Sequence, residues 1–287
     1  MSDNISAVTV LGTGVLGSQI AFQTAYHGLP VVAYDIDDDA LAAGRKRFTQ
    51  LIDTYEAEVD GAADGKAKEA FTRIRLTSDL SDAVAKADLV IEAVPEVLDV
   101  KKDTYRKLAT LAPERTIFAT NSSTLLPSDL KDLTGRPDRF LALHFANQIW
   151  RFNTAEVMGT ADTDPKVYAA VVEFANSIGM VPIELHREKA GYVLNSLLVP
   201  LLHAAAELAA GGYADPETVD NTWRIATGAP VGPFQIFDIV GLTTPYNLLS
   251  HGDEASQQIA AWLKDNYIDK GRLGVATGQG FYTYPTK

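Results

Sequence analysis

The segment FLALHFANQIWRFNTAE, residues 140–156, places a histidine after an apolar run and a carboxylate twelve positions later. Imidazole titrates near physiological pH, so His144 could take up or return a proton while Glu156 fixes its tautomer and stabilises the imidazolium. We therefore interpret the two residues as a general acid/base and its orienting partner. A single histidine at a strand end is more often an ordinary packed residue, so the rest of the sequence must decide between the two interpretations.

The composition is that of an ordinary globular protein of 287 residues, with 46% hydrophobic and 22% charged residues, and its length favours two domains. The 25 Lys and Arg against 37 Asp and Glu give a formal charge of −12, and no basic run concentrates positive charge, so we expect no nucleic-acid partner. Cysteine is absent, which excludes disulfides and thiolate chemistry and suits a reducing compartment. The first residues lack a signal-peptide pattern, and the most apolar stretch, 193–210, contains polar residues and a proline. We expect a cytoplasmic protein with no membrane partner, in which that stretch forms a buried helix.

Short β-rich runs alternate with helical stretches in the first half of the chain, which predicts a parallel sheet covered by helices. A long helical insert, near 38–71, is interrupted by GAADG at 61–65. After Lys189 the strand signals nearly vanish, and helix starts are expected at Asp215 and near Asp253. The expected strands are 7–12, 30–35, 87–94, 116–121 and 139–145.

The first two expected strands flank a glycine-rich loop, GTGVLG at 12–17, and the second of them ends in Asp35. Gly12 would allow the tight turn, Gly14 would let the backbone approach a pyrophosphate, and Gly17 would let the following helix pack on its strand. Asp35 would accept hydrogen bonds from a ribose diol and repel a 2′-phosphate, which favours NAD(H) over NADP(H). A flavin is compatible with the motif alone, but a histidine base favours nicotinamide hydride transfer.

We therefore predict an α/β protein with an N-terminal Rossmann dinucleotide-binding domain over residues 1–187, which carries the helical insert, and a smaller all-α C-terminal domain over residues 188–287. Hydride transfer to a ketone generates alkoxide character on oxygen, so the site needs a proton donor and fixed hydrogen-bond donors. Ser123, in the run NSST after an expected strand, could be such a donor, although NSST could equally cap a helix. Asn195 lies in a mostly apolar helix and could serve the site or make a structural hydrogen bond between helices. No spacing of histidines or carboxylates indicates a metal site.

The order of the motifs resembles the 3-hydroxyacyl-CoA dehydrogenase family over essentially the whole chain. The resemblance implies that the helical C-terminal domain forms a homodimer and that substrate binds between the two domains. It is carried by GTGVLG, Asp35, VIEAVPE at 90–96, Lys101, TNSST, HFAN, Glu156, GYVLN at 191–195 and GQGFYTY at 278–284.

The resemblance also implies roles for individual residues. His144 becomes the general acid/base and Glu156 its orienting partner, while Ser123 and Asn195 contact the reacting oxygen and the region of the histidine. The positions that it implies for contacts with NAD are Gly12, Thr13, Gly14, Val15, Leu16, Gly17, Asp35, Glu96, Lys101, Ser123 and Asn147.

Two departures from the family pattern concern the substrate. The family usually reads HFFNP at the histidine, whereas this chain reads HFANQIW, so Ala146 replaces an aromatic residue and Trp150 is expected near an altered substrate wall. The family holds CoA with a serine and a lysine on the helical insert, and an ungapped alignment puts Leu51 and Glu58 there. The segment LIDTYEAEVDG has four acids and no base, so phosphates would meet like charge, although Lys66 and Lys68 follow and could substitute.

We therefore expect an NADH-dependent reductase of β-dicarbonyl compounds, meaning β-keto esters and diketones, that also works in reverse as a 3-hydroxy dehydrogenase. One alternative is a dehydrogenase of short 3-hydroxyacyl-CoA substrates such as 3-hydroxybutyryl-CoA, or of a small 3-hydroxy compound such as carnitine. A further alternative, from another class of protein, is a catalytically idle NAD-binding structural or sensor protein.

Overall fold

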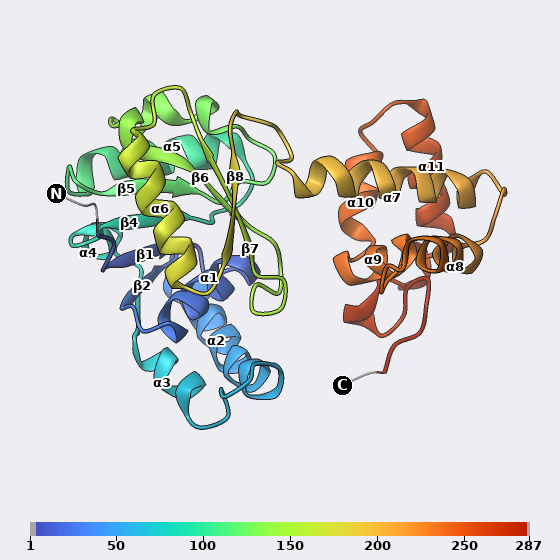
Figure 1. The fold of residues 1–287 in the computed structure, drawn as a ribbon, viewed down its shortest axis with the longest axis horizontal. Coiled ribbons are helices and arrows are strands. Elements are labelled where there is room, and N and C mark those ends of the chain that lie inside the picture. The colour runs from blue at the N-terminus through green and yellow to red at the C-terminus, as the bar shows by residue number, and fades with distance from the viewer. Residues whose placement is uncertain (1–3, 286–287) are drawn as a thin grey trace. The chain divides into compact units, whose positions relative to one another are not determined.

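The structure, a computed structural model, describes residues 4–285 and consists of two compact units that divide between Val193 and Leu194 (Figure 1). This division lies a few residues beyond the predicted domain boundary at 187/188, which stays a prediction. The expectation that the chain lacks a signal peptide rests in part on residues 1–3, which lie outside the described residues.

The first unit is built on an eight-stranded sheet with the order β3-β2-β1-β4-β5-β6-β7-β8. Neighbouring strands are parallel except at the β6·β7 pair, so β7 and β8 run against the other six. The strand order around β1 is that of a Rossmann sheet, in which dinucleotides bind at the switch point between β1 and β4, where the order of successive strands in the sheet reverses. The strands are β1 (Val8–Leu11), β2 (Val31–Tyr34), β3 (Ile74–Thr77), β4 (Leu89–Glu92), β5 (Ile117–Thr120), β6 (Phe140–Phe145), β7 (Thr154–Gly159) and β8 (Val181–Leu185).

Helices cover both faces of this sheet. Alternate residues of β1 show the division, because Val8 and Val10 belong to the core that includes residues of α1, α2, α3 and α6, whereas Leu11 belongs to the core that includes residues of α4 and α5. Both faces of the central strands are therefore buried, which explains their continuous apolar runs. The helices are α1 (Val15–Tyr26), α2 (Asp38–Glu58), α3 (Lys66–Thr72), α4 (Leu80–Val84), α5 (Leu98–Leu111) and α6 (Pro165–Ser177), with short 3-10 turns at Pro127–Asp129, Lys131–Leu133 and Pro137–Arg139.

The five expected strands are all present, and the helical insert divides into α2 and α3 at the GAADG segment as predicted. The start of α2 follows from the cap at Asp37, whose side chain accepts a hydrogen bond from the backbone N–H of Ala40. Three strands escaped prediction, namely β3, β7 and β8. The strand β8 contains Pro182 and lies at the sheet edge, where a missing backbone donor is tolerated.

The second unit is helical in its described part. The predicted helix starts are confirmed, because the side chains of Asp215 and Asp253 cap α8 and α11. The stretch 193–210 does form a helix, α7, but the prediction that this helix is buried is wrong for the single chain. In α7 only Leu202, Ala205 and Ala206 are buried, because the helix packs through a single face. No helix in residues 4–285 combines the length and apolar character needed to span a membrane. The helices are α7 (Leu194–Ala210), α8 (Pro216–Thr227), α9 (Pro233–Val240), α10 (Thr243–Leu249) and α11 (Glu254–Asn266), with 3-10 turns at Ile268–Lys270 and Val275–Thr277.

Candidate active site

The glycine loop between β1 and α1 has the geometry that a bound pyrophosphate requires. Gly12 has φ +93°, and a Cβ there would lie 2.5 Å from the carbonyl oxygen of Ala93. A Cβ at Gly17 would lie 2.0 Å from the carbonyl oxygen of Gly12, so this helix can pack closely only with glycine. A Cβ at Gly14 would meet nothing within 4 Å, which leaves the N-terminus of α1 open to an anion. These residues fit a dinucleotide.

Asp35 lies at the carboxyl end of β2, and the structure shows how the loop holds it. The backbone N–H and the hydroxyl of Thr13 both donate to its Oδ2, at 2.7 and 2.6 Å, and the N–H of Ile36 donates to Oδ1 at 2.8 Å. A carboxylate can accept about four hydrogen bonds, so one site is left for a ribose hydroxyl. Thr13, expected among the cofactor contacts, therefore serves first to position Asp35.

His144 and Glu156 lie directly opposite each other on the antiparallel strands β6 and β7. Their side chains are 6% and 5% exposed, and His144 Nδ1 is 3.0 Å from Glu156 Oε2. The other carboxylate oxygen, Oε1, accepts the backbone N–H of Val193 at 2.9 Å. A cross-strand pair in this register brings two side chains to the same face of the sheet, so the strand pairing itself builds the contact.

The hydrogen bonds define which ring nitrogen can react. A carboxylate can only accept, so Nδ1 of His144 carries the hydrogen and donates it to Glu156. In the neutral ring Nε2 is then an acceptor, and the hydroxyl of Ser123 lies 3.1 Å from it. The structure thus brings Ser123, His144 and Glu156 into one hydrogen-bonded series, with Nε2 as the atom able to gain and lose a proton.

Tyr192 holds the histidine from the side and was not predicted from the sequence. Its ring stacks on that of His144, with centroids 4.4 Å apart and planes 9° apart, and its hydroxyl donates to the carbonyl of Ser122 at 2.7 Å. Burial raises the pKa of Tyr192 well above its ordinary value, so this hydroxyl keeps its proton. The residue has φ +52°, a conformation that non-glycine residues rarely adopt.

Glu96 organises the loop that presents Ser123. Its Oε1 accepts hydrogen bonds from the hydroxyl of Ser122 at 2.5 Å and from the backbone N–H groups of Ser123 and Thr124, both at 3.0 Å. Burial disfavours the charged carboxylate, but the hydrogen bonds from Ser122 and Thr124 and the charge of Lys101 outweigh it and lower the pKa of Glu96 to about 2. Glu96 therefore acts as a fixed anion that shapes the NSST loop.

Lys101 connects Glu96 to a second carboxylate, Glu92, at the end of β4. Its ammonium lies 2.6 Å from Glu92 Oε1, 3.1 Å from Glu96 Oε2 and 3.3 Å from the carbonyl of Val94. Lys101 is 1% exposed and Glu92 0%. These three partners account for the three hydrogens of the ammonium, so the geometry shows Lys101 holding Glu96 in place. The predicted contact of Lys101 with NAD stays a prediction.

The remaining predicted residues belong to the segment between β6 and β7 and to the second unit. Asn147 is exposed and Ala146 half-buried, both just after β6. Trp150 packs against Tyr55 of α2, and its indole N–H donates to Glu58 Oε2 at 2.8 Å. Asn195 is the second residue of α7 and belongs to the second unit.

Sequence reasoning also missed Glu92. The available signal was a carboxylate that ends a continuously apolar strand, because such a group is buried and needs a partner. Tyr192 stood inside the quoted GYVLN motif, but its stacking depends on a positive φ that the sequence does not reveal. Asn121, whose side chain accepts the backbone N–H of Phe145 at 2.9 Å, joins the ends of β5 and β6.

The strand order, the open N-terminus of α1 and the placement of Asp35 define a dinucleotide-binding protein of the Rossmann class. Residues 7–189 match the family model for the NAD-binding domain of 3-hydroxyacyl-CoA dehydrogenase, and residues 191–284 match the model for its C-terminal domain. The chain belongs to the 3-hydroxyacyl-CoA dehydrogenase family. It is an NAD-dependent oxidoreductase that acts on CH–OH groups, which confirms the resemblance and the cofactor predicted from the sequence.

Individual relatives agree with this assignment. The mitochondrial hydroxyacyl-coenzyme A dehydrogenase of Rattus norvegicus is 33% identical over 288 residues, which cover 98% of this chain and 91% of the relative. Among solved structures, a diketoreductase described by its substrate-directed dual catalysis of dicarbonyl compounds is 69% identical, with a TM-score of 0.96 over 98% of this chain and 99% of that one. The (S)-3-hydroxybutyryl-CoA dehydrogenase of Ralstonia eutropha is 28% identical, with a TM-score of 0.84 over 99% and 100% of the two chains.

Proposed function

We propose that this protein is an NADH-dependent reductase of β-dicarbonyl compounds, β-keto esters and diketones, which also oxidises the corresponding β-hydroxy products. The observation that carries the chemistry is the hydrogen-bonded series of Ser123 Oγ, His144 Nε2 and Nδ1, and Glu156 Oε2. It supplies a proton donor, an oriented base and a hydroxyl beside the reacting nitrogen.

The proposed roles follow from which atoms are free to exchange hydrogen. When bound, NADH supplies the hydride. During reduction, protonated Nε2 of His144 delivers its proton to the developing alkoxide, and the Ser123 hydroxyl donates a hydrogen bond to the same oxygen. Glu156 holds Nδ1–H throughout and stabilises the imidazolium that exists before the proton leaves. Oxidation of the alcohol reverses the proton transfer at Nε2. The remaining proposed contact with the reacting oxygen, from Asn195, rests on the family resemblance.

The likeness to the diketoreductase supports the substrate class, since 69% identity extends over nearly the entire chain. The contacts of α2 add support against strong recognition of CoA. Leu51 is buried, and Glu58 accepts hydrogen bonds from Trp150 and Arg151, at 2.8 and 3.2 Å. A phosphate brought to this position would approach a carboxylate that is already fixed in place.

The two lysines that could have replaced a CoA-binding residue have other contacts. Lys68 lies 3.3 Å from Glu56 Oε1, and the ammonium of Lys66 lies 4.1 Å from the ring centroid of Tyr26. Both would have to leave these contacts to reach a phosphate.

The deciding experiment compares NADH oxidation with acetoacetyl-CoA and with ethyl acetoacetate under matched conditions. We expect kcat/KM for the ester to equal or exceed that for the thioester. A thioester efficiency more than a hundredfold above that of the ester would overturn the proposed substrate class. Tight NADH binding without turnover of either compound would instead indicate the idle binding protein.

The second candidate function is a short-chain 3-hydroxyacyl-CoA dehydrogenase. The observation that favours it is sequence similarity to the probable 3-hydroxybutyryl-CoA dehydrogenase of Bacillus subtilis (strain 168), which is 30% identical over 99% of both chains. The same pair of rates decides between the two, because CoA recognition must appear as a preference for the thioester.

We also propose a cytoplasmic homodimer formed through the second unit. Several large apolar side chains of that unit are exposed in the single chain, including Leu197 at 70% and Ile225 at 84%. Extensive exposed apolar surface of this kind is typical of protein–protein interfaces. Light scattering coupled to gel filtration should give about twice the chain mass of 31.0 kDa. A mass of one chain at micromolar concentration would contradict the dimer.

A further inference from the structure

Tyr192 lies where the parts of the proposed reaction site meet. Its ring stacks on the imidazole of His144, with centroids 4.4 Å apart and planes 9° apart. Its hydroxyl donates to the carbonyl of Ser122 at 2.7 Å, and Ser122 is the residue before Ser123. The backbone N–H of the residue after Tyr192 donates to Oε1 of Glu156 at 2.9 Å. One short segment therefore supports both ends and the middle of the hydrogen-bonded series.

The strands β6 and β7 hold the ring of Tyr192 in this position. Ala142 and Met158 lie opposite each other in the register of these antiparallel strands. The pair of His144 and Glu156 lies two positions further along. Because side chains two positions apart lie on the same face of a strand, the two pairs share one face of the sheet. Tyr192 is 1% exposed and packs in one buried cluster with Ala142 and Met158, so its ring extends over both pairs.

The backbone at Tyr192 adopts an unfavourable conformation. Gly191 has φ +79° and Tyr192 has φ +52°, so two successive residues are left-handed, which a tyrosine rarely adopts. The N–H of Tyr192 donates to the carbonyl of Lys189 at 3.0 Å and closes the turn. Strain of this kind persists where the surroundings fix it, and it is concentrated at functional sites. Here the strain coincides with a side chain that reaches the histidine.

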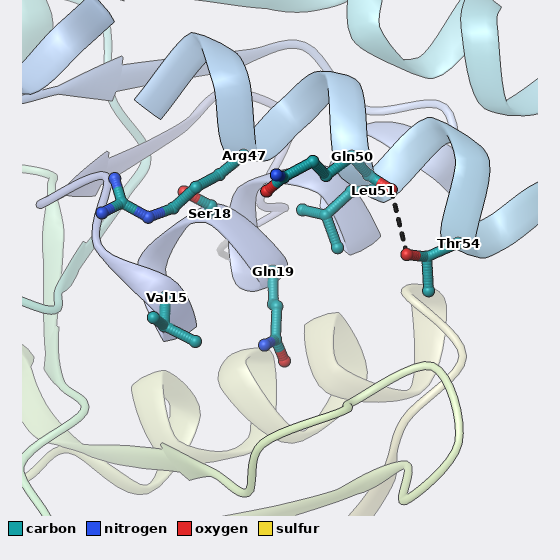
Figure 2. Close-up of a pocket in the computed structure, with 7 residues that line it drawn as sticks. All are labelled: Val15, Ser18, Gln19, Arg47, Gln50, Leu51 and Thr54. Atoms are coloured by element: carbon teal, nitrogen blue, oxygen red, sulfur yellow. Dashed lines mark hydrogen bonds between the residues drawn. The ribbon is translucent and has the colours of Figure 1, made fainter. Parts of the chain in front are cut away.

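The backbone beyond His144 is held separately, by α1. Gln148 has φ +61°, and its N–H donates to Oε1 of Gln19 at 2.8 Å. Figure 2 shows Gln19 among the side chains of α1 and α2 that line a cavity of about 240 Å³. None of the seven residues that line this cavity belongs to the hydrogen-bonded series. The contact of Gln19 therefore fixes the course of the chain after β6, whereas Tyr192 contacts the imidazole itself.

From these contacts we infer that Tyr192 is a positioning residue for the proton transfer. Its ring keeps the imidazole of His144 in the plane in which Nε2 lies 3.1 Å from Ser123 Oγ. Its hydroxyl holds the loop that carries this serine. Both groups must reach the same substrate oxygen, and a misplacement of about 1 Å can cost about a hundredfold in rate. This inference rests on the proposed function, in which His144 and Ser123 serve the reacting oxygen, and Tyr192 acts through them.

The test measures NADH-dependent reduction of ethyl acetoacetate by two variants. Tyr192→Phe keeps the stacked ring and loses only the bond to the carbonyl of Ser122, so kcat should fall about fivefold, as for one ordinary hydrogen bond. Tyr192→Leu loses the ring as well, and kcat should fall by roughly thirty- to a hundredfold. In both variants KM should change by less than about threefold, and the dissociation constant for NADH in a fluorescence titration by less than about twofold.

Tyr168→Phe is the matched control. Tyr168 is half-buried on α6, and its hydroxyl also donates to a backbone carbonyl, that of Val157 at 3.1 Å. Val157 adjoins Glu156 on β7, but its side chain lies on the opposite face of the strand. The control therefore removes the same kind of hydrogen bond away from the series, and its kcat should equal that of the wild type. Urea denaturation shows whether each variant is folded under the assay conditions.

Double variants separate positioning from a general loss of folded protein. If the hydroxyl acts through Ser123, Tyr192→Phe should lower kcat by less than about twofold when Ser123 is already alanine. Likewise, Tyr192→Leu should lower the residual kcat of His144→Ala by only about twofold. A merely structural role would reduce kcat by the same factor in every background, because it would change only the fraction of folded enzyme.

Three results would overturn the inference. They are a kcat of Tyr192→Leu within about threefold of the wild type, equal losses in the two single variants, and the same fold-loss in the alanine backgrounds as in the wild type. Should Tyr192→Leu fail to fold, Tyr192→Phe and its double variant with Ser123→Ala decide the question. Each of these results leaves the proposed function in place, because the wild type still reduces the ester. A wild type that does not reduce it rejects the proposed function and this inference together.

Discussion

The first unit contains two buried pairs of acidic and basic side chains, Lys101 with Glu92 at the end of β4, and His144 with Glu156 on the paired strands β6 and β7. In the first pair every polar atom has a partner. Glu92 accepts from Lys101, from the hydroxyls of Tyr105 and Thr120 and from the N–H of Val94. In the second pair Nδ1 of His144 is held by the carboxylate, while the one hydrogen-bond partner of Nε2 within residues 4–285 is the hydroxyl of Ser123, whose hydrogen can rotate.

The difference shows that burial and pairing do not by themselves indicate catalysis. A fully partnered ion pair fixes a structure, here the NSST loop through Glu96, because any rearrangement would leave a buried charge without a partner. A pair that keeps one exchangeable position can pass a proton to a substrate. We therefore assign Lys101 and Glu92 to support, and propose His144 and Glu156 for chemistry.

The largest expected effect concerns the supporting pair. Replacing Lys101 with Met leaves Glu92 as an uncompensated buried charge, which should lower the free energy of unfolding by about 3–5 kcal/mol. Urea denaturation measures the change. The double variant Glu92→Leu/Lys101→Met removes both charges and should recover most of the loss. If the single variant lost less than about 1 kcal/mol, the pair would not be the structural element described.

Glu156→Gln tests the orienting partner in the proposed catalytic pair. Glutamine keeps one acceptor oxygen but removes the charge that stabilises the imidazolium, so we expect kcat to fall about a hundredfold, or about 2.7 kcal/mol, with NADH affinity unchanged. Steady-state kinetics with ethyl acetoacetate give the answer. The proposal fails if kcat is retained.

Ser123→Ala probes the hydroxyl beside Nε2. Loss of a hydrogen bond to a developing charge should reduce kcat by about tenfold, since such bonds contribute roughly 1.5 kcal/mol or more. Ser128→Ala, in the same segment, is the matched control and should behave as the wild type. Equal activities of the two variants would remove Ser123 from the reaction.

The smallest expected effect is a pH dependence of the free energy of unfolding, which arises from Glu96, the second partner of Lys101. The pKa of Glu96 is lowered from 4.5 to about 2 in the folded protein, so its contribution to stability is complete above about pH 4.5 and is lost as the pH falls toward 2. Its side chain is 37% exposed, so solvent screening keeps the contribution modest. Glu96→Gln should show a shallower loss of unfolding free energy over this range. Identical acid profiles for the variant and the wild type would contradict the assignment.

The sequence allowed prediction of the elements whose signals are local. The glycine loop, Asp35 and the caps at Asp215 and Asp253 each depend on a few adjacent residues, and all were found in place. The contact between His144 and Glu156 was proposed from residue types, but the strand β7 that creates it was not predicted. That strand is six residues long and follows an irregular loop, so its pairing with β6 supplies the stabilisation that local preference lacks.

Other parts of the site depend on contacts between distant residues. Gln19 and Gln148 are 129 positions apart, and Glu92 meets Thr120 across 28 positions. The positive φ of Tyr192 is imposed by the folded surroundings, since no local signal favours it in a tyrosine. The exposed face of α7 could not be predicted either, because an apolar helix in a sequence does not reveal what covers it.

The most direct test of the central claim, that His144 carries the proton in NADH-dependent ketone reduction, is the turnover of His144→Ala with ethyl acetoacetate, measured beside its affinity for NADH. The account predicts a fall in kcat of roughly a hundredfold or more, with a dissociation constant for NADH close to that of the wild type. Unchanged turnover at saturating NADH and substrate would contradict it.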